Sequence, residues 1–129
     1  MLALRPGSPA AILVRLAILA LTVATGWIHL GLGGALFTLN GVGYLVAAAA
    51  MVVPIPFVRR FRWFIRLGLV GYALATIVGW YLMGPRWIVA YVAKAIEVAL
   101  IALLAVEIRS YDGNPIARIR RIVAPFVGA

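Results

Sequence analysis

The chain has 129 residues, of which 66% are hydrophobic and only 12% are charged, and its mean hydropathy is +1.12. A soluble domain is about 45–50% apolar and about 25% charged, and small domains bury only about two thirds of their surface on folding. Water is therefore excluded as the main solvent, and the composition predicts an integral membrane protein. The net charge of +9 comes from short basic clusters between apolar runs, which is typical of membrane-topology signals and does not indicate nucleic-acid binding.

Four apolar runs are long enough to cross a bilayer as helices, which takes about 20 residues each. They cover residues 10–31, 35–53, 63–83 and 87–108. Ser8-Pro9 predicts the start of the first helix, while Pro54-Ile55-Pro56 and Gly84-Pro85 predict breaks after the second and the third. We therefore expect an all-α fold, a single polytopic membrane domain over residues 1–129 with four transmembrane helices in an up-down bundle.

The arginines predict how such a bundle is oriented. Ten of them lie before or early in the first run, around the second connection or after the fourth run, and only Arg86 lies in the other two connections. The positive-inside rule then places both termini in the cytoplasm of a multi-pass protein in the inner (cytoplasmic) membrane. Arg59, Arg60 and Arg62 are expected at the lipid headgroups, and Arg15 is expected to extend toward them from within the first helix. A secretory signal over residues 1–26 is a competing interpretation, although Val23-Ala24-Thr25 is a poor cleavage site.

The C-terminal segment, residues 114–127, predicts a short amphipathic helix. Apolar side chains recur at helical spacing from Ile116 to Phe126, and the remaining positions include three arginines, Arg118, Arg120 and Arg121. Such a helix is expected to lie on an anionic leaflet, with these arginines at the lipid headgroups. A frayed basic tail and a docking site for a partner are the alternatives.

Residues that the chain lacks exclude several kinds of chemistry. It has no cysteine, which excludes disulfides, thiolate metal sites and a cysteine nucleophile. With His29 as its only histidine, one chain cannot supply a bis-histidine haem site or a histidine-rich zinc site. We therefore predict no metal site, no catalytic residue and no enzymatic activity.

Two ionisable residues within the fourth run are the strongest candidates for a site, because a charge inside a bilayer is costly unless it is paired. Lys94 and Glu97 are three residues apart, so they share one face of a helix and can neutralise each other. Further polar or aromatic candidates lie in the outer half of the spans, His29, Asn40, Tyr44 and Tyr91, and Arg86 lies in the connection outside the last two spans. Three interpretations stay open: structural pairing, a ligand site for an anion, a lipid or a quinone, and a proton path through Glu97.

Small residues indicate where helices can approach closely in lipid. The third run carries Gly68, Gly71, Ala75 and Gly79, and the first carries Ala17, Ala20 and Ala24. Such seams fit the inside of a four-helix bundle and equally a surface that docks against another membrane protein. The expected partners are the lipid bilayer and either other membrane subunits or further copies of this chain.

The segment His29-Leu30 followed by Leu36-Phe37-Thr38-Leu39-Asn40-Gly41-Val42-Gly43 resembles small four-span membrane proteins of high-GC bacteria and archaea. The run from Gly71 to Gly79 is similar to theirs as well. The resemblance covers the first three runs. It implies the four-span architecture and no particular activity.

Together these features predict a non-catalytic membrane subunit or accessory protein that packs against a larger complex, such as an energy-transducing one. The first alternative is a small oligomeric transporter or ligand-binding protein that uses Lys94 and Glu97. The second is a membrane anchor for quinone, or for haem held by His29 between two chains. No resident cofactor is predicted.

Overall fold

The computed structural model describes residues 3–84 and 86–127; it is 85% helix and has no strand in that part. Four helices are long and apolar enough to cross a membrane: α1 (Pro9–Gly31), α2 (Ala35–Val52), α4 (Arg62–Met83) and α5 (Ile88–Glu107). Each begins and ends within one residue of the range expected from the sequence. The predicted all-α fold with four apolar helices of this length is confirmed, and it is consistent with a multi-pass membrane protein.

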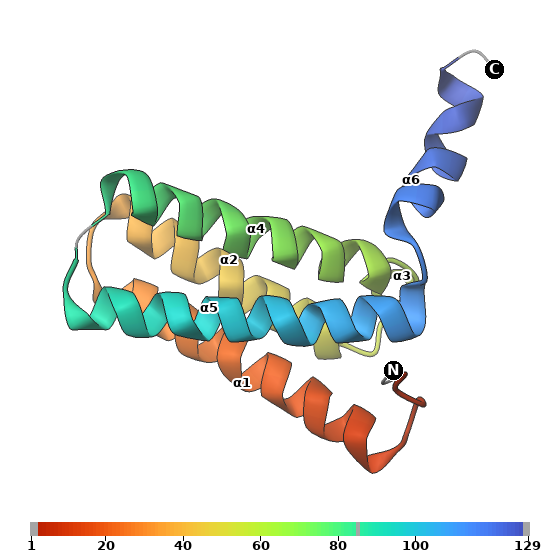
Figure 1. The fold of residues 1–129 in the computed structure, drawn as a ribbon, viewed down its shortest axis with the longest axis horizontal. Coiled ribbons are helices and arrows are strands. Elements are labelled where there is room, and N and C mark those ends of the chain that lie inside the picture. Colours follow the sequence, from red (N-terminus) through yellow and green to blue (C-terminus); the bar gives the residue numbers. More distant parts are fainter. Residues whose placement is uncertain (1–2, 85, 128–129) are drawn as a thin grey trace.

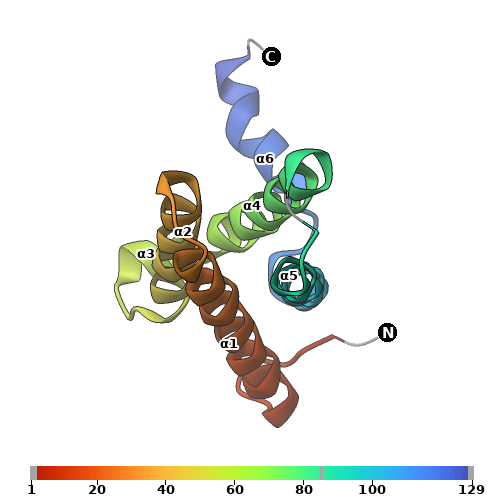
Figure 2. The ribbon, with the colours of Figure 1, turned by 90° about the vertical axis from the view of Figure 1, so that its left-hand side faces the viewer.

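The four long helices form a closed ring in which each packs on two others. α1 packs on α2 and α5, and α4 packs on the same two helices, as the view along the helices in Figure 2 shows. The N-terminal segment and the helices α3 (Pro56–Arg60) and α6 (Pro115–Val123) lie at one end, here called the terminal end (Figure 1). The C-terminal ends of α1 and α4 lie at the opposite end, here called the far end.

Local sequence signals explain where the helices begin and turn. Ser8 caps α1 by accepting a hydrogen bond from the Ala11 amide at 3.2 Å, and Pro9 follows at the first helical position. Gly33 and Gly34 have φ of 75° and 86°, so the connection from α1 to α2 uses a backbone conformation that favours glycine.

Two short elements were not expected from the sequence. The segment after the second run, expected only as a break, contains the five-residue helix α3. After α5 the chain continues as a π-helix, Ile108–Asp112, and Gly113 with φ of 69° then redirects it. Helix α6 and the 3-10 turn Ala124–Phe126 therefore point away from the four long helices (Figures 1 and 2).

Helices α1 and α2 approach each other closely at Gly26 and Gly41, which were not among the small residues expected to form seams. A Cβ atom on Gly41 of α2 would lie 2.7 Å from the Gly26 carbonyl oxygen of α1. The buried face of α1 carries Ile18, Thr22 and Thr25, whereas Ala20, expected in the seam, is exposed. Gly68 and Gly71 of α4 face open space, so that end of the expected stripe does not pack inside the ring.

The core of the ring is small and largely apolar. It is centred on a cluster of buried side chains: Ile18, Tyr44, Met51, Leu69, Leu100 and Leu104. Many large apolar side chains instead face outward, such as Leu36 and Ile88, which are 75% and 80% exposed. An apolar exterior around a small core fits helices that are surrounded by lipid.

Candidate ligand-binding site

A cavity of about 640 Å³ lies at the far end, between the four long helices. Its wall is mainly apolar, and each helix also contributes at least one polar side chain to it. The polar lining consists of His29 from α1, Asn40 from α2, Tyr72 and Thr76 from α4, and Lys94 from α5. Leu36, Phe37, Ala75 and Trp80 are among the apolar and aromatic lining residues. The structure thus brings three of the predicted site residues, His29, Asn40 and Lys94, to one cavity.

Lys94 and Glu97 form an ion pair at the inner wall of this cavity. The Lys94 ammonium lies 2.5 Å from Glu97 Oε1, and both residues are buried, Glu97 completely. The other carboxylate oxygen of Glu97 accepts a hydrogen bond from the Tyr44 hydroxyl of α2. The carboxylate therefore joins α5 to α2 and holds the ammonium beside the cavity.

Tyr44 is fully buried and organises the neighbouring aromatic and polar groups. Its ring meets Tyr72 of α4 edge-on, with centroids 4.8 Å apart. The Tyr72 hydroxyl donates to the main-chain carbonyl oxygen of Asn40 at 2.8 Å, which joins α4 to α2. A Cβ atom on Gly43 would overlap that hydroxyl, so a larger residue there would displace the Tyr72 ring.

His29 is buried and is oriented by its own helix. Its Nδ1 lies 2.7 Å from the Thr25 carbonyl oxygen. Because a carbonyl oxygen only accepts, this contact requires the proton on Nδ1, and in the tautomer that carries only this proton Nε2 is an acceptor. Within the described residues Nε2 has no hydrogen-bond partner, so it remains available to a ligand.

Two of the predicted site residues lie elsewhere. Tyr91 is half exposed and packs edge-on against Trp80 at 5.3 Å. Arg86 donates to the Tyr81 carbonyl oxygen at 2.6 Å and stacks on the Trp80 ring, which places it over the end of α4. Neither is among the described residues that line the cavity.

A second ionic cluster, at the terminal end, was missed by the sequence interpretation. Arg15 donates from Nε and Nη2 to both oxygens of Glu107, at 3.0 and 2.9 Å, and from Nη1 to the Met51 carbonyl oxygen. Arg66 Nη1 lies 3.8 Å from the same carboxylate, and Arg66 also donates from Nε and Nη2 to the two carboxylate oxygens of Asp112. Arg15, which was expected to extend toward the headgroups, is thus paired with Glu107 and with the α2 backbone, and Glu107 contacts arginines of both α1 and α4.

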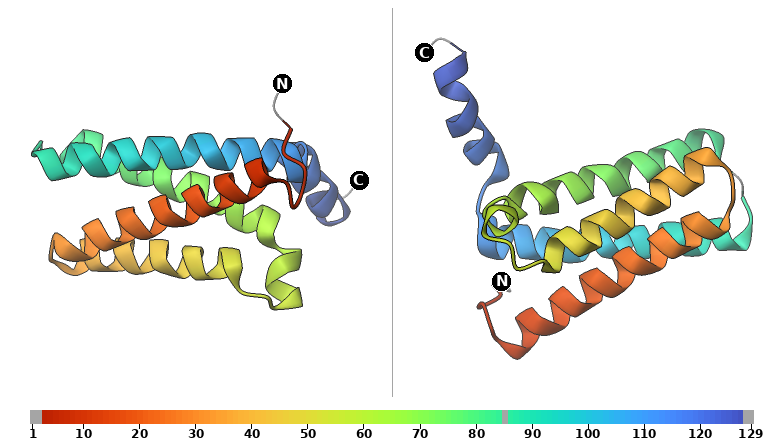
Figure 3. Two further views of the ribbon diagram at one scale, coloured as in Figure 1. Left: turned by 90° about the horizontal axis from the view of Figure 1, so that it is seen from below. Right: turned by 180° about the vertical axis from the view of Figure 1, so that it is seen from behind.

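This cluster lies where the helices separate. Both views of Figure 3 show α1 diverging from α2 toward the terminal end, and the long Arg15 side chain spans that gap to reach α2 and α5. Opposite charges at matching depth in the first and fourth runs were the available signal. They are 92 residues apart in the sequence, so their contact required knowing that α1 and α5 are neighbours.

The arginines expected at lipid headgroups fall into two groups. Arg62 donates to the Val53 carbonyl oxygen at 2.8 Å and thereby caps α2, while Arg118 stacks on the Trp63 ring at 4.7 Å. Four others are exposed at the terminal end: Arg59, Arg60, Arg120 and Arg121.

In comparisons with known proteins, no protein-family model, no curated protein and no solved structure matches the chain.

Proposed function

We propose that the chain is a multi-pass membrane protein that binds a small, uncharged, amphipathic molecule in the far-end cavity. The observation that carries this proposal is the convergence of polar side chains from all four long helices on one apolar cavity of about 640 Å³. Ligand pockets are typically about 300–1,000 Å³, mostly apolar, and contain a few convergent polar groups. A helix ring held together only by packing has no need for such a convergence.

The ion pair favours a ligand without net charge. Glu97 already neutralises Lys94 at 2.5 Å, so the two residues together contribute no net charge to the cavity. A bound anion or cation would place an uncompensated charge in a site of low dielectric, which is costly. A neutral molecule avoids this cost and still gains hydrogen bonds from the charged ammonium.

The hydrogen-bonding groups favour a ligand with carbonyl or hydroxyl oxygens. An ammonium has three N–H groups and Glu97 accounts for one, so Lys94 offers further donors, and the side-chain amide of Asn40 adds another. His29 Nε2 offers an acceptor. A quinone in its oxidised or reduced form, with carbonyl or hydroxyl oxygens on an apolar ring, matches this combination of donors, acceptor and aromatic wall.

We further propose that both termini lie in the cytoplasm and that the cavity faces the outer half of the inner membrane. The support is the charge asymmetry of the sequence, which has ten arginines toward the terminal end and only Arg86 near the far end. A ligand would then enter from the lipid phase or from the outer surface.

Equilibrium binding of a short-chain quinone to the chain in lipid nanodiscs tests the ligand proposal. The double variant Lys94→Met/Glu97→Gln removes both charges together and leaves no unpaired buried charge. Loss of a charge-assisted hydrogen bond is worth about 1.5–3 kcal/mol, so we expect binding at least about tenfold weaker. Tyr91→Phe, on the same helix but outside the lining, is the matched control and should bind like the wild type.

Two results would overturn this proposal: no saturable binding by the wild type, or equal affinity of the double variant. Decanoate serves as an anionic comparison, and tighter binding of decanoate than of quinone would contradict the charge argument. A visible spectrum of the protein purified from its native source tests the haem alternative, which requires a Soret band.

An accessory subunit is the second candidate, and one observation favours it. The exposed glycines Gly68 and Gly71 on α4 leave room for a helix of another membrane chain, and small residues are typical of such contacts. Purification in mild detergent is expected to retain a stoichiometric partner, and Gly71→Leu is expected to release it without unfolding the chain. Recovery of the monomer alone from native membranes would contradict this second candidate.

A further inference from the structure

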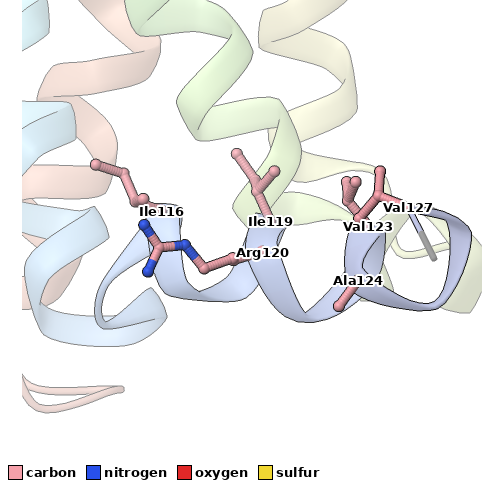
Figure 4. A pocket seen from close by; sticks show the side chains of 6 residues that line it. All are labelled: Ile116, Ile119, Arg120, Val123, Ala124 and Val127. Carbon is pink, nitrogen blue, oxygen red and sulfur yellow. The ribbon is translucent and has the colours of Figure 1, made fainter. Parts of the chain in front are cut away.

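Helix α6 has an apolar face that nothing covers in the described part of the chain. Ile116, Ile119 and Val123 are exposed, and with Arg120, Ala124 and Val127 they line a shallow groove (Figure 4). A row of exposed apolar side chains on one face of a helix indicates that another molecule or a membrane covers that face.

The base of α6 is held firmly, so its direction is set by the fold. Asp112, just before Gly113, accepts hydrogen bonds from Arg66 Nη2 and Nε at 2.6 and 2.7 Å. Asn114 caps α6, because its side chain accepts hydrogen bonds from the Ile116 and Ala117 amides. Arg118 stacks on Trp63 at 4.7 Å and fixes one flank of α6 to α4. As Figure 1 shows, α6 consequently points across the direction of the four long helices, as a helix lying on the surface of a membrane crossed by those helices would.

The charged side chains of α6 itself are all positive. Residues 114–129 contain three arginines and no acidic residue, and Arg59 and Arg60 are exposed at the same end. All three acidic residues of the chain form ion pairs, and their side chains are at most 6% exposed: Glu97, Glu107 and Asp112. A second copy of this chain therefore has no unpaired acidic side chain to complement the arginines, and two terminal ends would repel each other.

We propose that α6 lies along an anionic membrane surface, with its apolar face among the acyl chains and Arg121 and Arg120 toward the lipid phosphates. Negative phosphates supply the charge that no residue of this chain offers, and acyl chains cover the apolar face. The proposal rests on membrane insertion of the four long helices and is independent of the cavity ligand.

Spin-label accessibility tests this placement in the full chain. Because the chain has no cysteine, Val123→Cys and Arg121→Cys each introduce a single labelling site, and these positions lie on different faces of α6. Each labelled chain is placed in nanodiscs of phosphatidylcholine alone or with phosphatidylglycerol, and collisions of the label with oxygen and with a water-soluble nickel chelate are measured.

In the phosphatidylglycerol membrane we expect the label at residue 123 to collide mainly with oxygen and the label at residue 121 mainly with the chelate. We also expect the oxygen preference at residue 123 to fall several-fold in phosphatidylcholine alone, or when Arg120→Gln and Arg121→Gln are introduced together. A label at residue 123 that meets mainly the chelate in the anionic membrane would overturn the proposal and identify a solvated arm. Shielding from both reagents would also overturn it, because a protein would then cover this face.

Discussion

Glu97 is a fully buried carboxylate with two partners on different helices, the Lys94 ammonium and the Tyr44 hydroxyl. In surroundings of low dielectric, such a group is stable only while its charge is matched, so removing one partner costs more than removing the charge pair. The pair therefore contributes to stability and to the site at once. The two roles are separable by comparing single and double variants.

Lys94→Met alone is predicted to destabilise the chain by about 3–5 kcal/mol, because it leaves Glu97 charged, buried and unpaired by an ammonium. The double variant Lys94→Met/Glu97→Gln should recover most of that loss. Unfolding of the reconstituted chain by denaturant measures both changes. Equal destabilisation by the single and double variants would show that the pair matters only for packing.

At the scale of helices, the interface between α1 and α2 depends on backbone contact at Gly26 and Gly41, whereas Gly71 of α4 meets nothing within 4 Å. The two positions give a matched test of which helix faces pack inside the ring. Gly41→Ala is predicted to cost about 1–3 kcal/mol through overpacking. Gly71→Ala should be neutral or stabilising by up to about 1 kcal/mol, because alanine is the better helix former.

Thermal unfolding of both variants in the same detergent measures how much stability each substitution costs. Comparable loss at both sites would mean that the α4 glycines also pack against a helix, for example in an oligomer. Comparable tolerance would mean that α1 and α2 do not approach as closely as the structure has them.

The helix ends could be predicted from the sequence because their signals are local. Ser8-Pro9 and Pro54 act on the backbone within a few residues, whatever the tertiary structure. Lys94 and Glu97 were likewise recognisable as a pair from their spacing. The sequence did not show which face of each helix is buried, because apolar residues surround each helix almost evenly. Contacts such as Arg15 with Glu107, or Tyr44 with Glu97, depend on which helices become neighbours, and no local pattern encodes that.

At the scale of the whole molecule, the charge distribution predicts orientation. The exposed arginines of the terminal end include Arg5, Arg59, Arg60 and Arg109, and the C-terminal helix α6 belongs to the same end. In a bacterial host, a C-terminal fusion to green fluorescent protein should fluoresce, and a fusion to alkaline phosphatase should be inactive, since both report a cytoplasmic C-terminus. The opposite pair of results would contradict the proposed orientation and place the cavity toward the cytoplasm.

The most direct test of the proposed function is to locate a bound quinone by its quenching of tryptophan fluorescence. Trp80 lines the cavity, whereas Trp63 lies at the terminal end beneath Arg118. Two variants that retain only Trp80 or only Trp63, with the other tryptophans changed to phenylalanine, are titrated with a short-chain quinone in nanodiscs. We expect saturable quenching of Trp80, abolished by Lys94→Met/Glu97→Gln, and only weak unsaturable quenching of Trp63. Equal quenching of both tryptophans would show mere partition into lipid and would contradict a binding site in the cavity.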